Sequence, residues 1–270
     1  MNNPELYLQI GTKILDQYTL SVLGDYLHRF INGDHGKKTI LDIGAGPGHF
    51  TYNNIYLPLR HQVGQLIGID QSEKMVNHAN QHYGNELINF RQLNIEKKEV
   101  PEEFLHSFDY VFSFWALHFV KDEEQTYINI LNMMKPGGDA LLLFPASCVL
   151  YDVYKKVWNR PRWSAFITED DFVRTPYSRF QRPQESFSNF LSGVGFKTQE
   201  CSLSKISLSM SDVEIKAFVA SIIPVMDKIP KDFQEDFLED HLKELFTRIS
   251  YNDDLLYVLD YNIFVVHAKK

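Results

Sequence analysis

Three glycines stand at alternate positions shortly after an acidic residue. Residues 42–48 read DIGAGPG; they end a short β-branched segment, 39–43, and precede a segment with helical character. Glycine lets the backbone turn tightly and lets a ligand approach the main chain closely, because no Cβ intervenes. This spacing predicts a ligand-binding turn at the end of the first strand.

A second acidic residue, Asp70, ends another apolar segment, residues 66–70. A carboxylate at the end of the second strand can accept hydrogen bonds from both hydroxyls of a ribose. The nicotinamide or flavin fingerprint requires Gly or Ala where this chain has His49, which disfavours a dinucleotide. Asp42, ahead of the turn, suits a ligand that carries an amino group. A nucleoside joined to an amino acid, S-adenosylmethionine, meets both conditions.

A histidine, His118, follows the apolar segment 110–114. Open α/β sheets bind their ligands at the carboxyl edge, where this residue is expected. With an ordinary pKa near 6.5, His118 is the candidate catalytic base for a hydroxyl acceptor. The alternative is a structural histidine that is held by hydrogen bonds.

Apolar strands that alternate with helical segments must position these residues. Helices are predicted over 4–31 and from Ser72, as N-cap, to Tyr83. The almost wholly apolar strands are typical of a parallel sheet covered on both faces, an α/β fold. Two helical insertions follow the fifth strand, and the second begins with a capping box at residues 211–214. Strands are predicted at 39–43, 66–70, 90–95, 110–114, 140–144, 197–209 and 260–268.

The composition limits the class of protein. The 270 residues are 44% hydrophobic with a formal charge of −8, which favours a folded domain and disfavours nucleic acids and anionic membranes as partners. The two cysteines, Cys148 and Cys201, cannot build a disulfide framework or a thiolate zinc site, and we expect no metal. Because no signal peptide or membrane span is evident, we expect a cytoplasmic protein with a small-molecule substrate and no obligate protein partner.

The turn at 42–48 resembles motif I of class I S-adenosylmethionine-dependent methyltransferases, and Asp70 resembles their ribose-binding acid. Asn94 stands where that family usually has an Asp for the adenine amino group, and its carbonyl can still accept that hydrogen bond. Residues 135–138, KPGG, match the turn before their fifth strand. The resemblance implies a Rossmann-like sheet of seven strands, the last antiparallel, and these cofactor-binding residues: Asp42, Gly44, Ala45, Gly46, Asp70, Gln71, Asn94, Ile95 and Ser113.

Over nearly its full length the chain resembles the insect juvenile hormone acid O-methyltransferase family. Residues 235–240 have no role with a cofactor, so their agreement indicates common descent. The resemblance implies an enzyme that methylates a small molecule and releases S-adenosylhomocysteine. The segments that carry it are 1–3 with Leu6 and Tyr7, 113–118 (SFWALH), 151–154 (YDVY), 229–232 (IPKD) and 235–240 (EDFLED).

Two departures from this family concern the acceptor. Family members usually have Trp after the histidine, where this chain has Phe119, and Gln near Ile14, with Gln17 the nearest replacement. Those family residues are associated with binding the acid substrate. Because this chain lacks them, we expect a paralogue whose acceptor is the phenolic hydroxyl of a small aromatic, such as a vinylphenol. A phenol with a pKa of about 10 would need His118 as a base. The alternative acceptor is the carboxylate of a sesquiterpenoid acid, juvenile hormone acid or farnesoic acid.

Aromatic residues in and near the insertions suggest a helical cap over the acceptor, although such a stripe is often ordinary core. The predicted core is 1–146, 191–210 and 258–270, and the predicted cap is 147–190 and 211–257. A binder of S-adenosyl ligands without turnover and a protein or RNA methyltransferase are the alternatives; net acidity and a closed lid disfavour the latter. The predicted substrate-binding residues are Tyr7, Trp115, His118, Phe119, Tyr151, Tyr154 and Trp163.

Overall fold

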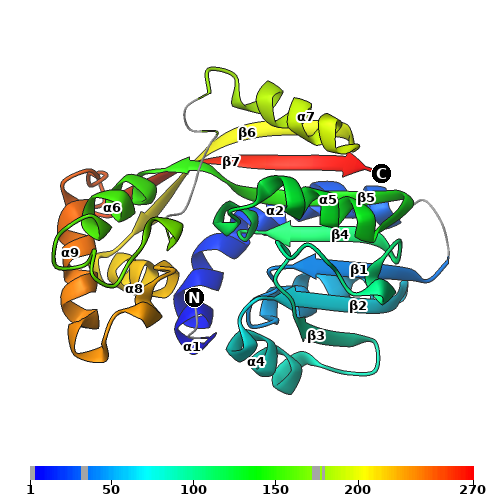
Figure 1. Cartoon of the computed structure of the whole chain (residues 1–270), viewed down its shortest axis with the longest axis horizontal. Helices are drawn as coiled ribbons and strands as arrows, with labels where there is room; N and C mark the ends of the chain where they lie inside the picture. The colour runs from blue at the N-terminus through cyan, green and yellow to red at the C-terminus, as the bar shows by residue number, and fades with distance from the viewer. Residues whose placement is uncertain (1–3, 32–35, 172–176, 178–179) are drawn as a thin grey trace.

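The computed structural model describes residues 4–31, 36–171, 177 and 180–270. Residues 1–3, which contribute to the family resemblance, lie outside the described part. The described strands form one seven-stranded sheet in the order β3-β2-β1-β4-β5-β7-β6 (Figure 1). Only β7 is antiparallel to its neighbours, as predicted. The strands are β1 Lys38–Ile43, β2 Val63–Asp70, β3 Ile88–Gln92, β4 Phe108–Phe114, β5 Met134–Cys148, β6 Lys197–Met210 and β7 Tyr257–Lys269.

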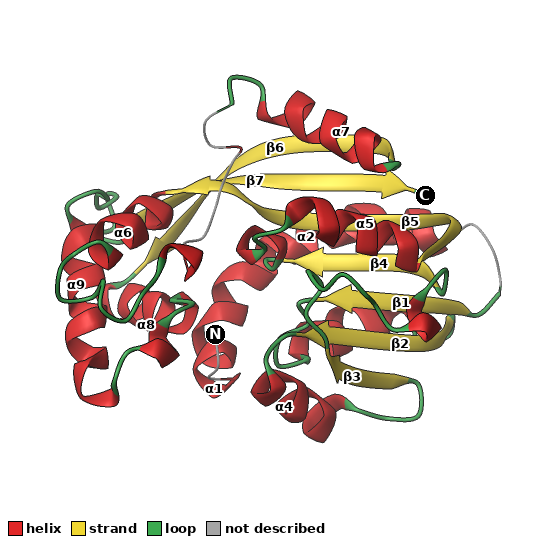
Figure 2. Cartoon of the chain, viewed as in Figure 1, coloured by secondary structure: helices red, strands yellow, loops and turns green. Residues whose placement is uncertain are grey.

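Helices pack on both faces of this sheet (Figure 2). The predicted N-caps are confirmed: the Ser72 hydroxyl accepts from the Met75 N–H, and Ser211 forms a capping box with Glu214. A π-helical turn, Tyr7–Gly11, interrupts the N-terminal helix. The helices are α1 Pro4–Leu6, α2 Thr12–Ile31, α3 Leu57–Leu59, α4 Glu73–Tyr83, α5 Glu123–Met133, α6 Val149–Trp158, α7 Pro183–Val194, α8 Asp212–Ile222 and α9 Gln234–Phe246.

Alternate side chains of the central strands enter two separate cores. In β1, Ile40 joins a cluster that α2 and α4 cover, whereas Leu41 and Ile43 join a second cluster that α5 and α7 cover. Successive side chains of a strand point to opposite faces, so a strand that is apolar throughout requires helices on both sides. The apolar strands of the sequence therefore predict this layering correctly.

Two strand predictions differ from the structure because strand ends depend on their partners. The third strand is Ile88–Gln92, not 90–95, since its ladder with β2 stops where β2 stops, at the pair Asp70 and Gln92. Asn94 and Ile95 consequently lie in a loop. The fifth strand extends to Met134–Cys148, well beyond the predicted 140–144, because β4 pairs with it from Met134 to Leu143 and β7 pairs with it from Asp139 to Cys148.

The α7 helix packs on the sheet (Figure 1). The Phe187 ring of α7 is fully buried, with centroids 5.4, 5.5 and 5.1 Å from those of Tyr127, Phe144 and Phe264. The packing of α7 therefore favours placing residues 183–190 with the sheet, although the sequence predicted them in the cap. We propose that α6, α8 and α9 form the cap.

Polar contacts between α6 and α9 hold the cap together. The Trp158 indole N–H donates to Nε2 of His241 at 2.9 Å, deep in the cap. Arg160, just after α6, pairs with Asp240 at 3.1 Å and with Glu244 at 3.3 Å. Partly buried ion pairs of this kind orient two helices even where their net free energy is small. In the described residues, no helix is long and apolar enough to cross a membrane.

Candidate active site

The glycine turn after β1 lies at the carboxyl edge of the sheet. Gly44, Gly46 and Gly48 have φ angles of +75°, +54° and +84°, a left-handed region that glycine enters without strain. A Cβ on Gly44 would lie 2.1 Å from the Cβ of Ala116, so the turn and the loop after β4 can meet only if residue 44 is glycine. A Cβ on Gly46 would meet no atom within 4 Å, because this position borders a cavity.

That cavity, of about 340 Å³, lies outside the ends of β1, β2, β3 and β4. Its size falls in the range of small-molecule sites, and its place is the point where strand order reverses, from β1 to β4. Tyr7 from the N-terminal segment and Pro224 from the loop after α8 complete its wall. The predicted cofactor-binding residues that line it are Gly44, Gly46, Asp70, Gln71, Asn94 and Ile95.

Asp70 is positioned by two backbone donors. Its Oδ2 accepts from the Gly46 N–H at 3.0 Å and its Oδ1 from the Ser72 N–H at 2.8 Å. Burial raises the pKa of Asp70, and these two hydrogen bonds oppose the rise. The carboxylate is thus fixed in orientation at the end of β2, where its remaining lone pairs can accept from a ligand.

Two further carboxyl groups, Asp42 and Asp16, line a smaller adjoining cavity with Gly44, Ala45 and Gly46. Asp42 is buried at the end of β1 and accepts from the Thr51 hydroxyl at 2.6 Å. Burial raises the pKa of Asp42, and also that of Asp16, to about 7. Both carboxyl groups therefore stand where a cationic amino group would favour their ionised forms.

We expect the Asp42→Asn substitution to stabilise the ligand-free protein more at pH 8 than at pH 5. The pKa of an Asp is near 3.9 in the unfolded chain, whereas that of Asp42 in the folded protein is about 7. The stabilisation that comes from the retained proton is therefore complete below about pH 4 and is lost as the pH rises to about 7. An amide does not titrate and escapes this loss. Thermal unfolding of both proteins at the two pH values measures the difference, and an equal gain at both would contradict it.

Two other predicted cofactor-binding residues have different surroundings from those expected. Asn94 lines the large cavity, but its Oδ1 already accepts from the Glu96 N–H at 2.9 Å. Ser113 is fully buried in β4 and donates to the Ile43 carbonyl at 2.9 Å. Its side chain points to the neighbouring strand and lines none of the cavities at this sheet edge, so a contact between Ser113 and the cofactor stays a prediction that the cavity lining does not support.

A second cavity, almost wholly apolar, lies between the sheet edge and the cap. It includes Tyr7, Trp115 and Phe119, which also line the large cavity, so the two spaces adjoin at these aromatic rings. A methyl donor in one and an acceptor in the other would meet there. The lining residues are Tyr7, Leu15, Trp115, His118, Phe119, Pro145, Cys148, Leu150, Tyr151, Tyr154, Phe218, Ile222 and Tyr261.

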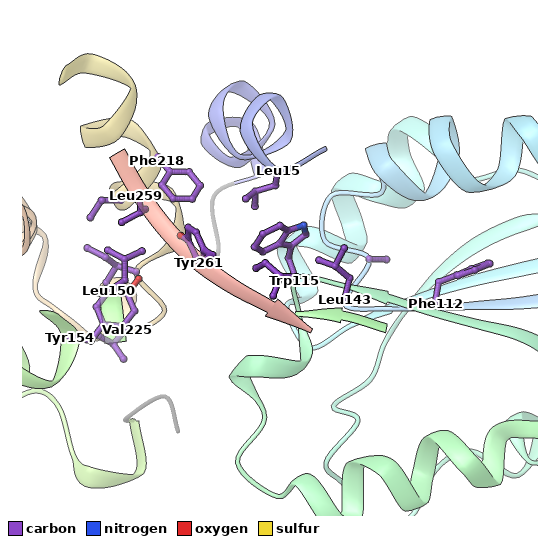
Figure 3. Close-up of a cluster of buried hydrophobic side chains, with 14 of the residues drawn as sticks. Leu15, Phe112, Trp115, Leu143, Leu150, Tyr154, Phe218, Val225, Leu259 and Tyr261 are labelled. Carbon is purple, nitrogen blue, oxygen red and sulfur yellow. The ribbon is translucent and has the colours of Figure 1, made fainter. Parts of the chain in front are cut away.

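Trp115 is held at this junction in a strained conformation. Its φ is +57°, a region that non-glycine residues seldom occupy and that clusters at functional sites. The indole N–H donates to the Thr19 hydroxyl of α2 at 2.8 Å, and the backbone N–H donates to the Leu143 carbonyl at 2.8 Å. Figure 3 shows Leu15, Leu143 and Tyr261 around the ring. The N-terminal helix therefore helps to fix the wall between the two cavities.

His118 and Tyr151 both line the apolar cavity, with ring centroids 6.3 Å apart. Nδ1 of His118 and the hydroxyl of Tyr151 are both buried without a hydrogen-bond partner. Burial lowers the pKa of His118 to about 3 and raises that of Tyr151 well above its usual value. Both side chains are therefore neutral near pH 7.

The structure does not bring Trp163 to either cavity. It is fully buried inside the cap, where its indole N–H donates to Asp240 at 2.7 Å and its ring packs on Phe237 at 5.0 Å. These contacts are with α9 and not with the acceptor cavity, so substrate binding by Trp163 stays a prediction that the cavity lining does not support. Tyr151 and Tyr154 of α6, which precede it in the chain, do line that cavity.

Several lining residues carry no signal in the sequence. Asp16 and Thr19 belong to a helix whose spacing indicates only an amphipathic face, and Pro224 follows a capped helix far along the chain. Phe218 and Ile222 look like ordinary apolar helix positions. Each reaches the site through the packing of α2 and α8 against the sheet edge, which no local pattern encodes.

Comparisons with known proteins agree with this geometry. The family described as "Methyltransferase domain" matches residues 34–167. The juvenile hormone acid O-methyltransferase of Bombyx mori is 30% identical over all of this chain and 98% of that protein. The enzyme of the same name from Drosophila melanogaster is 31% identical over all of this chain and 93% of its own length.

Solved structures support the fold alone. The YcgJ protein of Bacillus subtilis superimposes with a TM-score of 0.56 at 20% identity, covering 93% of this chain and 98% of that one. Phosphoethanolamine N-methyltransferase 2 of Haemonchus contortus, in complex with S-adenosyl-L-methionine, gives a TM-score of 0.50 at 16% identity. That match covers 91% of this chain and 51% of the other.

Proposed function

Because the chain belongs to the juvenile hormone acid O-methyltransferase family of class I methyltransferases, we propose that its acceptor is the carboxylate of a hydrophobic, sesquiterpenoid-type acid. The protein is an S-adenosylmethionine-dependent methyltransferase, so the interpretation as a binder without turnover is set aside. The observation that carries the proposal is full-length similarity to two enzymes named for this acid, together with the apolar cavity beside the glycine turn.

The residues of the large cavity fit the cofactor. We propose that Asp70 accepts from the ribose hydroxyls, that the turn at Gly44 and Gly46 leaves room for the amino-acid portion, and that Asp42 faces its ammonium group. When bound, S-adenosylmethionine supplies a methyl group on a cationic sulfur. Trp115, Tyr7 and Phe119 would then align the two reactants and exclude water from the junction.

Alignment can supply most of the rate acceleration for a carboxylate acceptor. Such an acid is already ionised near pH 7, so no base is required. Well-oriented reactants can gain about 7–11 kcal/mol from positioning alone. The reaction also joins an anion to a cation and leaves both products neutral, which a dry aromatic cavity does not oppose.

The state of His118 supports an acid over a phenol. A histidine whose pKa is about 3 is a very weak base, and a phenol with a pKa of about 10 would hold its proton against it. The comparisons likewise do not support the phenolic acceptor that the sequence led us to expect, since both full-length relatives are named for a carboxylic acid.

A long acceptor requires the cap to move. The apolar cavity has a volume of about 40 Å³, enough for only a few water molecules. Phe218 and Ile222 of α8 and Tyr154 of α6 border it on the cap side. An acid with an extended apolar chain would therefore displace these helices from the sheet edge, and closure behind it would exclude water.

Initial rates with a panel of acceptors test this proposal. We expect farnesoic acid and juvenile hormone acid to be methylated and 4-vinylphenol to give no product by mass spectrometry. At saturating cofactor, the rate with farnesoic acid should change by less than about twofold from pH 7 to 9, because neither the acid nor His118 titrates there. Turnover of the phenol that rises with pH, without turnover of either acid, would refute the proposal.

A further inference from the structure

Two polar atoms in the acceptor cavity are buried without partners, Nδ1 of His118 and the Tyr151 hydroxyl. Folded proteins rarely leave buried polar groups unpaired, because their hydrogen bonds with water are lost without replacement. Two such groups on residues of one cavity, 6.3 Å apart at the ring centroids, point to a ligand that supplies the missing hydrogen bonds.

Two other polar groups at this cavity already have partners within the chain. The Trp115 indole N–H donates to Thr19, and the Tyr261 hydroxyl is hydrogen-bonded to the thiol of Cys148. Among the described residues, no Lys or Arg lines the cavity. An acidic acceptor would therefore have to be held by neutral hydrogen-bond donors.

Resting on the proposed function, we propose that His118 and Tyr151 bind the acceptor carboxylate as a pair, each donating one hydrogen bond to one oxygen. A carboxylate has two acceptor oxygens and can accept hydrogen bonds from two donors at once, whereas a phenol offers a single oxygen. Hydrogen bonds from neutral donors to a carboxylate are stronger than those to an uncharged oxygen, so the pair selects an acid.

The protonation states on each side suit this assignment. Burial lowers the pKa of His118, so the imidazole is neutral and carries one proton, which can reside on Nδ1. Burial also raises the pKa of Tyr151, so its hydroxyl keeps the proton that it donates. The pair positions the acceptor and removes no proton from it.

The Tyr151→Phe substitution provides the first test. Isothermal titration with S-adenosylhomocysteine bound would compare farnesoic acid with farnesol, which has the same chain and no carboxylate. We expect the substitution to weaken binding of the acid by about ten- to a hundredfold and that of the alcohol by less than about threefold. The matched control is Tyr261→Phe, which removes a cavity hydroxyl already bonded to Cys148 and should affect both ligands equally.

A second pair of variants tests His118. His118→Asn keeps an N–H donor near the position of Nδ1, whereas His118→Phe keeps only an aromatic ring. We expect kcat/KM for farnesoic acid to fall at least about tenfold more in the Phe variant than in the Asn variant, mainly through KM, with similar unfolding temperatures. Equal losses in the two variants would overturn the donor role.

These outcomes separate the two proposals. If the wild-type enzyme methylates phenols and neither acid, the proposed function fails. If it methylates acids but Tyr151→Phe weakens the binding of farnesoic acid and farnesol equally, or weakens the binding of neither, the carboxylate acceptor stands. The paired binding by His118 and Tyr151 is then overturned.

Discussion

Replacing Asp70 with Asn is expected to weaken S-adenosylmethionine binding by at least about a hundredfold. The Asp70 carboxylate accepts from the Gly46 and Ser72 N–H groups and, in our assignment, from the ribose hydroxyls. Hydrogen bonds to a charged group are worth about 1.5–3 kcal/mol each, so losing both bonds from the ribose would cost about a hundredfold or more. An amide also places an NH2 group where one carboxylate oxygen was, so it opposes one of the two backbone N–H donors. Isothermal titration with the cofactor measures the loss.

A modified ligand is the control for this prediction. An S-adenosylhomocysteine analogue without the two ribose hydroxyls cannot make the bonds that Asp70 is expected to accept. The substitution should therefore cost this analogue much less affinity than it costs S-adenosylhomocysteine itself. Equal losses with the two ligands would show that Asp70 acts by shaping the turn through Gly46 and Ser72, not by holding the sugar.

Gly44→Ala is expected to abolish cofactor binding and to lower the unfolding temperature by roughly 5–15 °C. The new Cβ would lie 2.1 Å from that of Ala116, in a residue whose φ of +75° already disfavours a side chain. Left-handed strain costs about 1–2 kcal/mol and overpacking about 1–3 kcal/mol more. The loop after β4 must move to relieve the contact, and it carries Trp115. Thermal unfolding and cofactor titration measure the two effects.

Two further variants separate the clash from the strain. Gly137 also has a positive φ, +78°, but a Cβ there meets nothing within 4 Å, so Gly137→Ala should cost only the strain and leave cofactor binding intact. Adding Ala116→Gly to Gly44→Ala removes the other methyl group and should restore part of the lost stability. A Gly137→Ala protein as unstable as Gly44→Ala would mean that backbone strain alone explains the effect.

The acceptor illustrates how a sequence difference can mislead. The chain lacks Trp at position 119 and Gln at position 14, and from this loss of donors we expected a phenol. The structure places two other unpartnered polar groups, from His118 and Tyr151, in the same cavity. Checking only the positions of the family's Trp and Gln does not reveal a hydrogen-bond donor that another part of the chain supplies in their place.

Local patterns in the sequence determined the sheet, its two helical faces and the cofactor turn. Residues 42–48 and Asp70 could be assigned because a glycine turn and a strand end depend on neighbours a few positions away, and the apolar periodicity of β1 and β2 depends only on their own residues. For the same reason the caps at Ser72 and Ser211 were predictable.

Only the tertiary structure decided which side chains meet in the cavities and which protons they hold. It directed Ser113 and Trp163 to internal partners, brought Asp16 and Pro224 to the site, and buried His118 so that its pKa falls to about 3. Side-chain direction and desolvation are set by atoms that lie far apart in the chain. They arise from how α2, the cap and the sheet edge pack together, so no short stretch of sequence contains them.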